Sequence, residues 1–87
     1  MSEAVKNAIN ATIDNLRLAI ALDVEEISPI ITGLDSDNDL AYSLSKLSSQ
    51  RDPLKKKLGE RVITQLKSFP EEARGQIVER ALSSSYL

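Results

Sequence analysis

The sequence contains no cysteine, no histidine and no tryptophan, and only 3% of its 87 residues are aromatic. Without cysteine no disulfide can staple the chain, and the thiolate nucleophile is absent. Without histidine the side chain that most often serves as a general base near neutral pH is missing. An enzyme would have to work with Asp, Glu, Lys, Ser or Tyr, and a metal would have to bind through carboxylates alone. We therefore expect no catalytic residue, no metal and no cofactor.

Long apolar runs are missing as well. The longest, Leu18–Leu22, is far below the ~20 residues that a membrane span needs. The first residues, Met1-Ser2-Glu3, place no basic region ahead of an apolar stretch, which argues against a secretory signal. The absence of cysteine fits a reducing compartment. These features predict a cytoplasmic protein with no membrane segment.

The chain does contain apolar residues at helical spacing, and no alternating strand pattern accompanies them. A chain of 87 residues suits one domain. We expect an all-α fold, a small bundle of four to five short helices that forms a single domain over residues 1–83, with a frayed tail at 84–87. The expected helices cover residues 2–22, 24–32, 38–50 and 53–68, and a last helix runs to residue 83 from a start within 68–72.

Local signals set these boundaries. Asp23 is expected to cap the second helix and Gly33 to end it. Pro29 leaves two possibilities open, a kink in one helix or the start of another. Pro53 follows a capping aspartate and begins the fourth helix. Inside that helix Gly59 is either merely tolerated or allows a close helix contact.

The apolar spacing also predicts which side chains face the core. In the third helix the apolar residues are expected to point inward and the serines outward, among them Ser43. In the fourth helix the inward series is expected to begin with Leu54 and Leu58 and to continue at steps of three to four residues.

The first helix has a wide apolar arc. Its polar residues form one narrow stripe, so apolar side chains cover more of the helix than a peripheral position needs. Either this helix is central to the domain, or one side of it meets another chain. A small bundle has little room for a central helix, and a chain without disulfides gains stability by oligomerising. We therefore expect a homodimer, with an interface that includes Val5, Ile9, Leu16 and Ile20.

Charge is unevenly distributed along the chain. The formal net charge is −2, but residues 1–45 carry two basic and eight acidic side chains, whereas residues 46–67 carry seven basic and two acidic ones. Lys55, Lys56 and Lys57 fall in the first turn of a helix, where the dipole disfavours each cation by about 0.3–1 kcal/mol. A helix selected only for stability would carry acids there. We predict a basic strip that binds an acidic protein partner, formed by Lys46, Arg51, Lys55, Lys56, Lys57 and Arg61.

Two other interpretations of this strip stay open. It could be an ordinary solvated surface, with Lys56 paired to Glu60 one helical turn away. It could also bind nucleic acid, with residues 51–67 supplying the recognition helix of a helix-turn-helix. The acidic balance of the chain and the lack of aromatic residues near the lysines count against nucleic acid. The favoured prediction is a small non-enzymatic regulatory or adaptor protein.

One acidic cluster matches a calcium-binding motif at its start only. Asp35, Asp37 and Asp39 have the spacing of the first ligands of an EF-hand loop. Leu40 then occupies the position that needs glycine, and Lys46 stands where the bidentate glutamate belongs. We interpret the cluster as an ordinary acidic turn.

Overall fold

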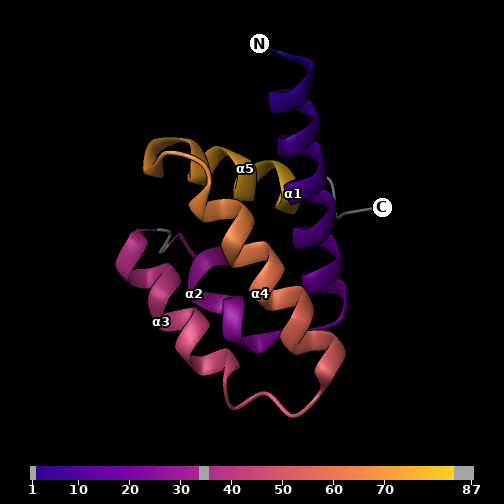
Figure 1. Cartoon of the computed structure of the whole chain (residues 1–87), viewed down its shortest axis with the longest axis vertical. Coiled ribbons are helices and arrows are strands. Elements are labelled where there is room, and N and C mark those ends of the chain that lie inside the picture. Colours follow the sequence, from indigo (N-terminus) through magenta and orange to yellow (C-terminus); the bar gives the residue numbers. More distant parts are fainter. Residues whose placement is uncertain (1, 34–35, 84–87) are drawn as a thin grey trace.

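The computed structural model describes residues 2–33 and 36–83, and the expected frayed tail at 84–87 lies outside these ranges. The described residues form helices and turns without any strand, which confirms the all-α prediction. Figure 1 shows α3 and α4 side by side, with α1 along the other side of α4 and α5 across one end. The elements are α1 (Glu3–Ala21), the 3-10 helix η1 (Glu25–Ile27), α2 (Ser28–Ile31), α3 (Asp37–Leu47), α4 (Pro53–Lys67) and α5 (Glu71–Ser83).

Helix α1 begins at a serine cap and ends at a left-handed residue. The Ser2 side chain accepts a hydrogen bond from the Val5 amide at 3.2 Å. At the other end, Asp23 has a φ of 58°, and its amide donates to the Ile20 carbonyl. The Val24 amide reaches the Ala19 carbonyl at 3.0 Å, which completes a Schellman motif. The prediction that Asp23 caps the following helix is therefore wrong, because this residue ends α1.

The segment around Pro29 forms two short elements. The 3-10 helix η1 starts after Val24 without a side-chain cap, and α2 follows it with Pro29 in its first turn. This arrangement answers the question that the sequence left open in favour of a new start at the proline. Gly33 then adopts a φ of 102°, a backbone conformation that favours glycine, and ends α2 as expected.

Helix α3 starts one residue earlier than expected and ends three residues sooner, at Leu47. A capping box fixes its start: the Ser36 hydroxyl accepts from the Asp39 amide, and the Asp39 carboxylate accepts from the Ser36 amide, both at 3.2 Å. The prediction that Ser43 faces solvent is wrong, since this serine is fully buried. Ser43 lies three residues after Leu40 and four before Leu47, both fully buried, so helical spacing places its hydroxyl in the core.

One apolar core joins the elements. Helix α1 packs against α4 and α5, and α3 packs against α4. Within α1 the buried side chains all belong to the second half, whereas residues 2–11 are exposed except for half-buried Ile9. The first turns of α1 accordingly extend beyond the other helices (Figure 1). The largest fully buried apolar side chains are Leu16, Ile27, Ile30, Leu40, Leu47, Val62, Ile63 and Leu66.

Gly59 lies at the closest approach of α3 and α4. The residue is buried, and a Cβ atom added to it would stand 2.7 and 2.9 Å from the two Cδ atoms of Leu47. Real Cβ atoms do not come that close to a neighbour without something moving. The glycine therefore permits a close helix contact, which is the second of the two roles considered from the sequence.

Arg74 of α5 connects three helices. Its guanidinium is buried and donates from Nε to the carbonyls of Leu66 and Phe69, at 2.8 and 3.2 Å. Leu66 lies in the last turn of α4 and Phe69 directly follows the helix, where a cation is favoured by the helix dipole. The Nη1 atom also lies 2.8 Å from the Asp37 carboxylate in the first turn of α3. One arginine thus links the end of α4 to the start of α3.

Candidate partner-binding surface

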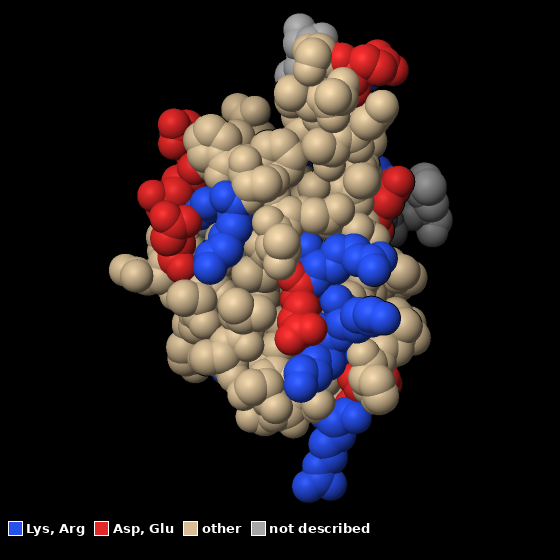
Figure 2. All heavy atoms as spheres, viewed as in Figure 1, with Lys and Arg blue, Asp and Glu red and all other residues tan. Residues whose placement is uncertain are grey.

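The six predicted basic residues come from α3, the α3–α4 loop and α4. Lys46 lies in the last turn of α3, and Arg51 lies in the loop. The other four belong to α4, and we call them the α4 basic face: Lys55, Lys56, Lys57 and Arg61. Lys57 and Arg61 are exposed, and the other two are half-buried. Figure 2 shows Lys and Arg side chains gathered over this part of the molecule, with some acidic atoms among them.

The start of α4 is fixed by Asp52 and Pro53, as the sequence predicts. The Asp52 carboxylate accepts from the amides of Leu54 and Lys55, at 3.0 and 3.4 Å. Pro53 occupies the first turn, where its missing N–H leaves no bond unmade. This single carboxylate offsets part of the unfavourable interaction between the lysines and the positive end of the helix.

None of the six basic side chains forms an ion pair within the described residues. The two pairs found there, Asp14–Arg17 and Asp37–Arg74, lie elsewhere. The solvated-surface interpretation paired Lys56 with Glu60, and the structure does not bring these two groups within 4.0 Å. No carboxylate among the described residues therefore lies within 4.0 Å of the cationic groups of the α4 basic face.

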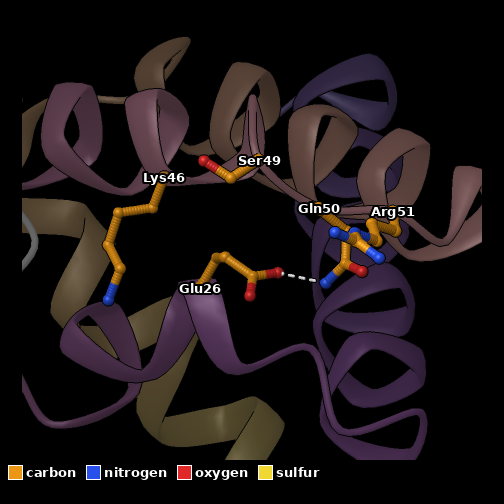
Figure 3. A pocket seen from close by; sticks show the side chains of 5 residues that line it. All are labelled: Glu26, Lys46, Ser49, Gln50 and Arg51. Atoms are coloured by element: carbon orange, nitrogen blue, oxygen red, sulfur yellow. Dashed lines mark hydrogen bonds between the residues drawn. The ribbon is translucent and has the colours of Figure 1, made fainter.

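Lys46 and Arg51 line a different part of the surface from Lys57 and Arg61. They line a notch together with Glu26 of η1 and with Ser49 and Gln50, which follow α3 (Figure 3). The Gln50 amide donates to the Glu26 carboxylate at 2.6 Å, and its oxygen accepts from the Asp52 amide at 3.0 Å. The notch carries both signs of charge, so it is less suited to an acidic partner than the α4 basic face.

Lys57 and Arg61 border an apolar hollow, which we call the α1–α4 hollow. It measures about 210 Å³ and is lined by Asn15, Leu18, Leu54, Lys57, Leu58 and Arg61. Leu58 is buried, as predicted, but Leu54 is 62% exposed, so the prediction that it faces the core is wrong. Leu18 of α1 is 49% exposed. The two exposed leucines therefore share one hollow with two cations.

Sequence reasoning named Lys57 and Arg61 but missed the leucines beside them. A signal was present for Leu54, because it stands three residues before Lys57 and seven before Arg61, on one side of the helix. No local signal could have placed Leu18 there, since it belongs to a distant helix and reaches the site only through the packing of α1 on α4.

The predicted dimer interface on α1 is only partly available. Leu16 is 0% exposed within the single chain, and the prediction is wrong for this residue because it belongs to the core. Ile9 and Ile20 are half-buried against that core. Val5 is 45% exposed on the part of α1 that extends beyond the bundle. Of the four predicted interface residues, only Val5 is therefore fully available to a second chain.

Two structural features were looked for among the described residues, a cluster of metal ligands and a helix that could span a membrane. Residues 2–33 and 36–83 contain no group of three or more Asp or Glu side chains placed to hold a metal ion. Asp35, which belongs to the acidic turn, lies outside these ranges. None of the described helices combines the length and the apolarity needed to cross a membrane.

We compared the chain with known proteins at three levels. No protein-family model matches it, and no curated protein and no solved structure was found to be similar. Its function must therefore be argued from its own residues.

Proposed function

We propose that this protein is a non-enzymatic regulatory or adaptor protein that binds an acidic protein partner through the α4 basic face. One observation carries the proposal: four cations on one helix have no carboxylate within ion-pair distance among the described residues. Uncompensated charge of one sign creates a field that steers an oppositely charged partner and sets its orientation. The three lysines also stand near the positive end of their own helix, so they cost stability that binding would explain.

An acidic protein fits this surface better than a nucleic acid does. Glu60 lies between Lys57 and Arg61 in the chain and is exposed, so it would repel a phosphate backbone. Single-stranded nucleic acid is usually held by aromatic side chains on which bases stack. Tyr42 lies on α3 with the Lys46 ammonium 5.6 Å from its ring, and Phe69 packs against the core. Neither of these rings belongs to the α4 basic face.

Fluorescence anisotropy with labelled probes tests the proposal. The probes are a Glu-rich helical peptide, a short duplex DNA and a single-stranded RNA. We expect the peptide to bind and its affinity to fall as salt is added. A variant with Lys57→Glu and Arg61→Glu should lose this binding. The matched control is Lys67→Glu, which changes an exposed cation of α4 that does not line the hollow and should leave binding unchanged.

Two other results would contradict the proposal. Binding of DNA or RNA that is lost in the same charge-reversed variant would favour the helix-turn-helix alternative instead. If no acidic peptide binds at low salt, where electrostatic attraction is strongest, the proposal is wrong.

We also propose that two copies associate through the first half of α1. Val5 is exposed on the first turns of α1, and Ile9 is half-buried one turn later on the same side of the helix. Residues 2–8 are exposed in the single chain, and a second chain would bury part of this surface. Sedimentation equilibrium measures the result directly, since a dimer has twice the mass of one chain.

A further inference from the structure

The α1–α4 hollow has the composition of a small protein-binding site. Its floor is apolar, its walls are the exposed Leu18 and Leu54, and its rim on α4 carries Lys57 and Arg61. Exposed leucines that gather in one place and are bordered by charge are typical of interaction surfaces. Tyr42 and Leu44 of α3 are also exposed, but they do not line this hollow.

We infer that the partner's binding segment is an acidic amphipathic helix, which inserts an apolar side chain between Leu18 and Leu54 and places carboxylates on Lys57 and Arg61. The inference rests on the proposed function and names the class of partner. Charge complementarity supports it, because the rim carries two cations that the described chain leaves without an ion pair. The charges by themselves would mainly raise the association rate and orient the partner. The apolar contact would add binding affinity.

The spacing along α4 suits a helical ligand. Leu54, Lys57 and Arg61 occupy successive turns of one helix face and span about 10 Å at a rise of ~1.5 Å per residue. A helix laid in a groove presents its side chains at the same intervals of three and four residues. An apolar anchor and an acid one or two turns away on the ligand would therefore reach Leu54 and Arg61 together.

The hollow is also preformed. Asn15 of α1 donates a hydrogen bond from its amide to Gln65 of α4 at 2.9 Å, which fixes the spacing of the two helices beside it. Leu58 forms part of its lining and is held in the core. A site that needs no rearrangement loses less free energy when it binds.

A second copy of this chain fits the hollow poorly. Its exposed acids Asp23 and Glu25 flank Val24, which is 3% exposed and cannot serve as an anchor without unfolding. The free end of α1 offers Val5, but Glu3 there is offset by Lys6. The exposed Tyr42 and Leu44 of α3 follow Asp37 and Asp39, but Asp37 is paired with Arg74 and Asp39 accepts hydrogen bonds from the cap residue Ser36. The acids that precede these apolar residues are therefore already engaged within the chain.

Three synthetic helical peptides test the inference by fluorescence anisotropy. The first carries glutamates and leucines at helical spacing, the second has the leucines replaced by serine, and the third keeps the leucines but has glutamine in place of glutamate. We expect the first to bind at least about tenfold more tightly than either of the others, since burial of a leucine is worth a factor of that order.

Substitutions at the hollow locate the contact. Leu54→Gln should weaken binding of the first peptide at least about tenfold and leave the affinity for the serine peptide unchanged. Leu44→Gln is the matched control, because Leu44 is an exposed leucine of α3 that does not line the hollow. Circular dichroism should show both variants folded, since each changes an exposed side chain.

Each outcome distinguishes the two proposals. If the acidic peptides bind and depend on Lys57 and Arg61, but Leu54→Gln has no effect, the hollow is not the anchor and only the proposed function stands. If no acidic peptide binds, both fail. If Leu54→Gln abolishes self-association of the protein in sedimentation, the occupant is a second copy, and the inference about an acidic helix is overturned.

Discussion

Arg74 shows how one buried charge can be satisfied mainly by backbone carbonyls. Its Nε donates to the carbonyls of Leu66 and Phe69, while its ion-pair partner Asp37 has a side chain that is 70% exposed. We expect Arg74→Met to lower the free energy of unfolding by about 2–3 kcal/mol, because charged hydrogen bonds in a buried site are lost. Urea denaturation measures the change.

Asp37→Asn is the matched variant for that experiment. It removes the ion pair but keeps every bond from Arg74 to the α4 carbonyls, so it should cost less than about 1 kcal/mol. Equal losses for the two variants would contradict this view and place the stabilisation in the ion pair.

Whether a substitution at Gly59 raises or lowers stability depends on the side chain at position 47. Gly59→Ala raises helix propensity by about 1 kcal/mol, but the new methyl group would meet the buried Leu47. Overpacking costs typically about 1–3 kcal/mol, so the single variant should lose stability. In a Leu47→Val background the clashing Cδ atoms are gone, and the same change should be neutral or stabilising. A double-mutant cycle by urea denaturation would show no coupling if the contact is unimportant.

At the scale of whole elements, the ends of helices were predictable where a residue type has one common role. Gly33 and Pro53 act as the sequence predicts. Asp23 does not, because an aspartate suits both a helix N-cap and a left-handed C-terminal position. Its role was decided by tertiary structure: Val24 is buried, and its amide bonds to Ala19.

Helical spacing predicted the apolar face of a helix, but it did not predict how far along the helix that face is covered by other helices. Leu16 and Val5 share the apolar side of α1, yet one is in the core and the other lies beyond it. Leu54 continues the apolar series of α4 and is exposed, because it stands in the first turn and borders a hollow. Which turns of a helix have neighbours depends on packing between distant segments, and no local pattern contains that information.

The start of α4 gives a prediction about lysines that lie near the unfavourable end of their helix dipole. Lys55→Glu puts an acid three residues after the Asp52 cap, where the helix dipole favours it. We expect the free energy of unfolding to rise by about 0.3–1 kcal/mol at low ionic strength, with a smaller gain when salt is added. Thermal and urea unfolding measure the change.

Lys67→Glu provides the comparison at the other end of the helix. It replaces a favourable cation in the last turn of α4 with an acid, so it should lower stability by a similar amount. If Lys55→Glu is destabilising instead, the lysines contribute to the fold, and the argument that they are retained for binding loses its physical basis.

At the scale of the molecule, the basic strip is continuous in the sequence but not on the surface. Lys46 and Arg51 meet Glu26 in a notch of mixed charge, whereas Lys57 and Arg61 border the α1–α4 hollow. The site could be predicted as far as its charges, because these are adjacent in the chain. Its apolar part could be predicted only for Leu54, because Leu18 comes from a distant helix.

Self-association is the remaining property of the whole molecule. If α1 dimerises through its first half, sedimentation equilibrium of the intact protein should give the mass of two chains at micromolar concentrations typical of modest interfaces. Val5→Asp should shift the mass to that of one chain, because a charge would be buried in an apolar contact. Circular dichroism should be unchanged, since Val5 lies outside the core.

Two further variants separate an interface from the core. Leu44→Asp places the same charge on an exposed apolar position of α3 and should leave the dimer intact. Leu16→Asp should unfold the protein, because this side chain is 0% exposed in the single chain and a buried unpaired carboxylate is costly. A monomeric wild type would contradict the dimer, and the exposed turns of α1 would then need a different partner. A dimer that survives Val5→Asp would place the interface elsewhere on the molecule.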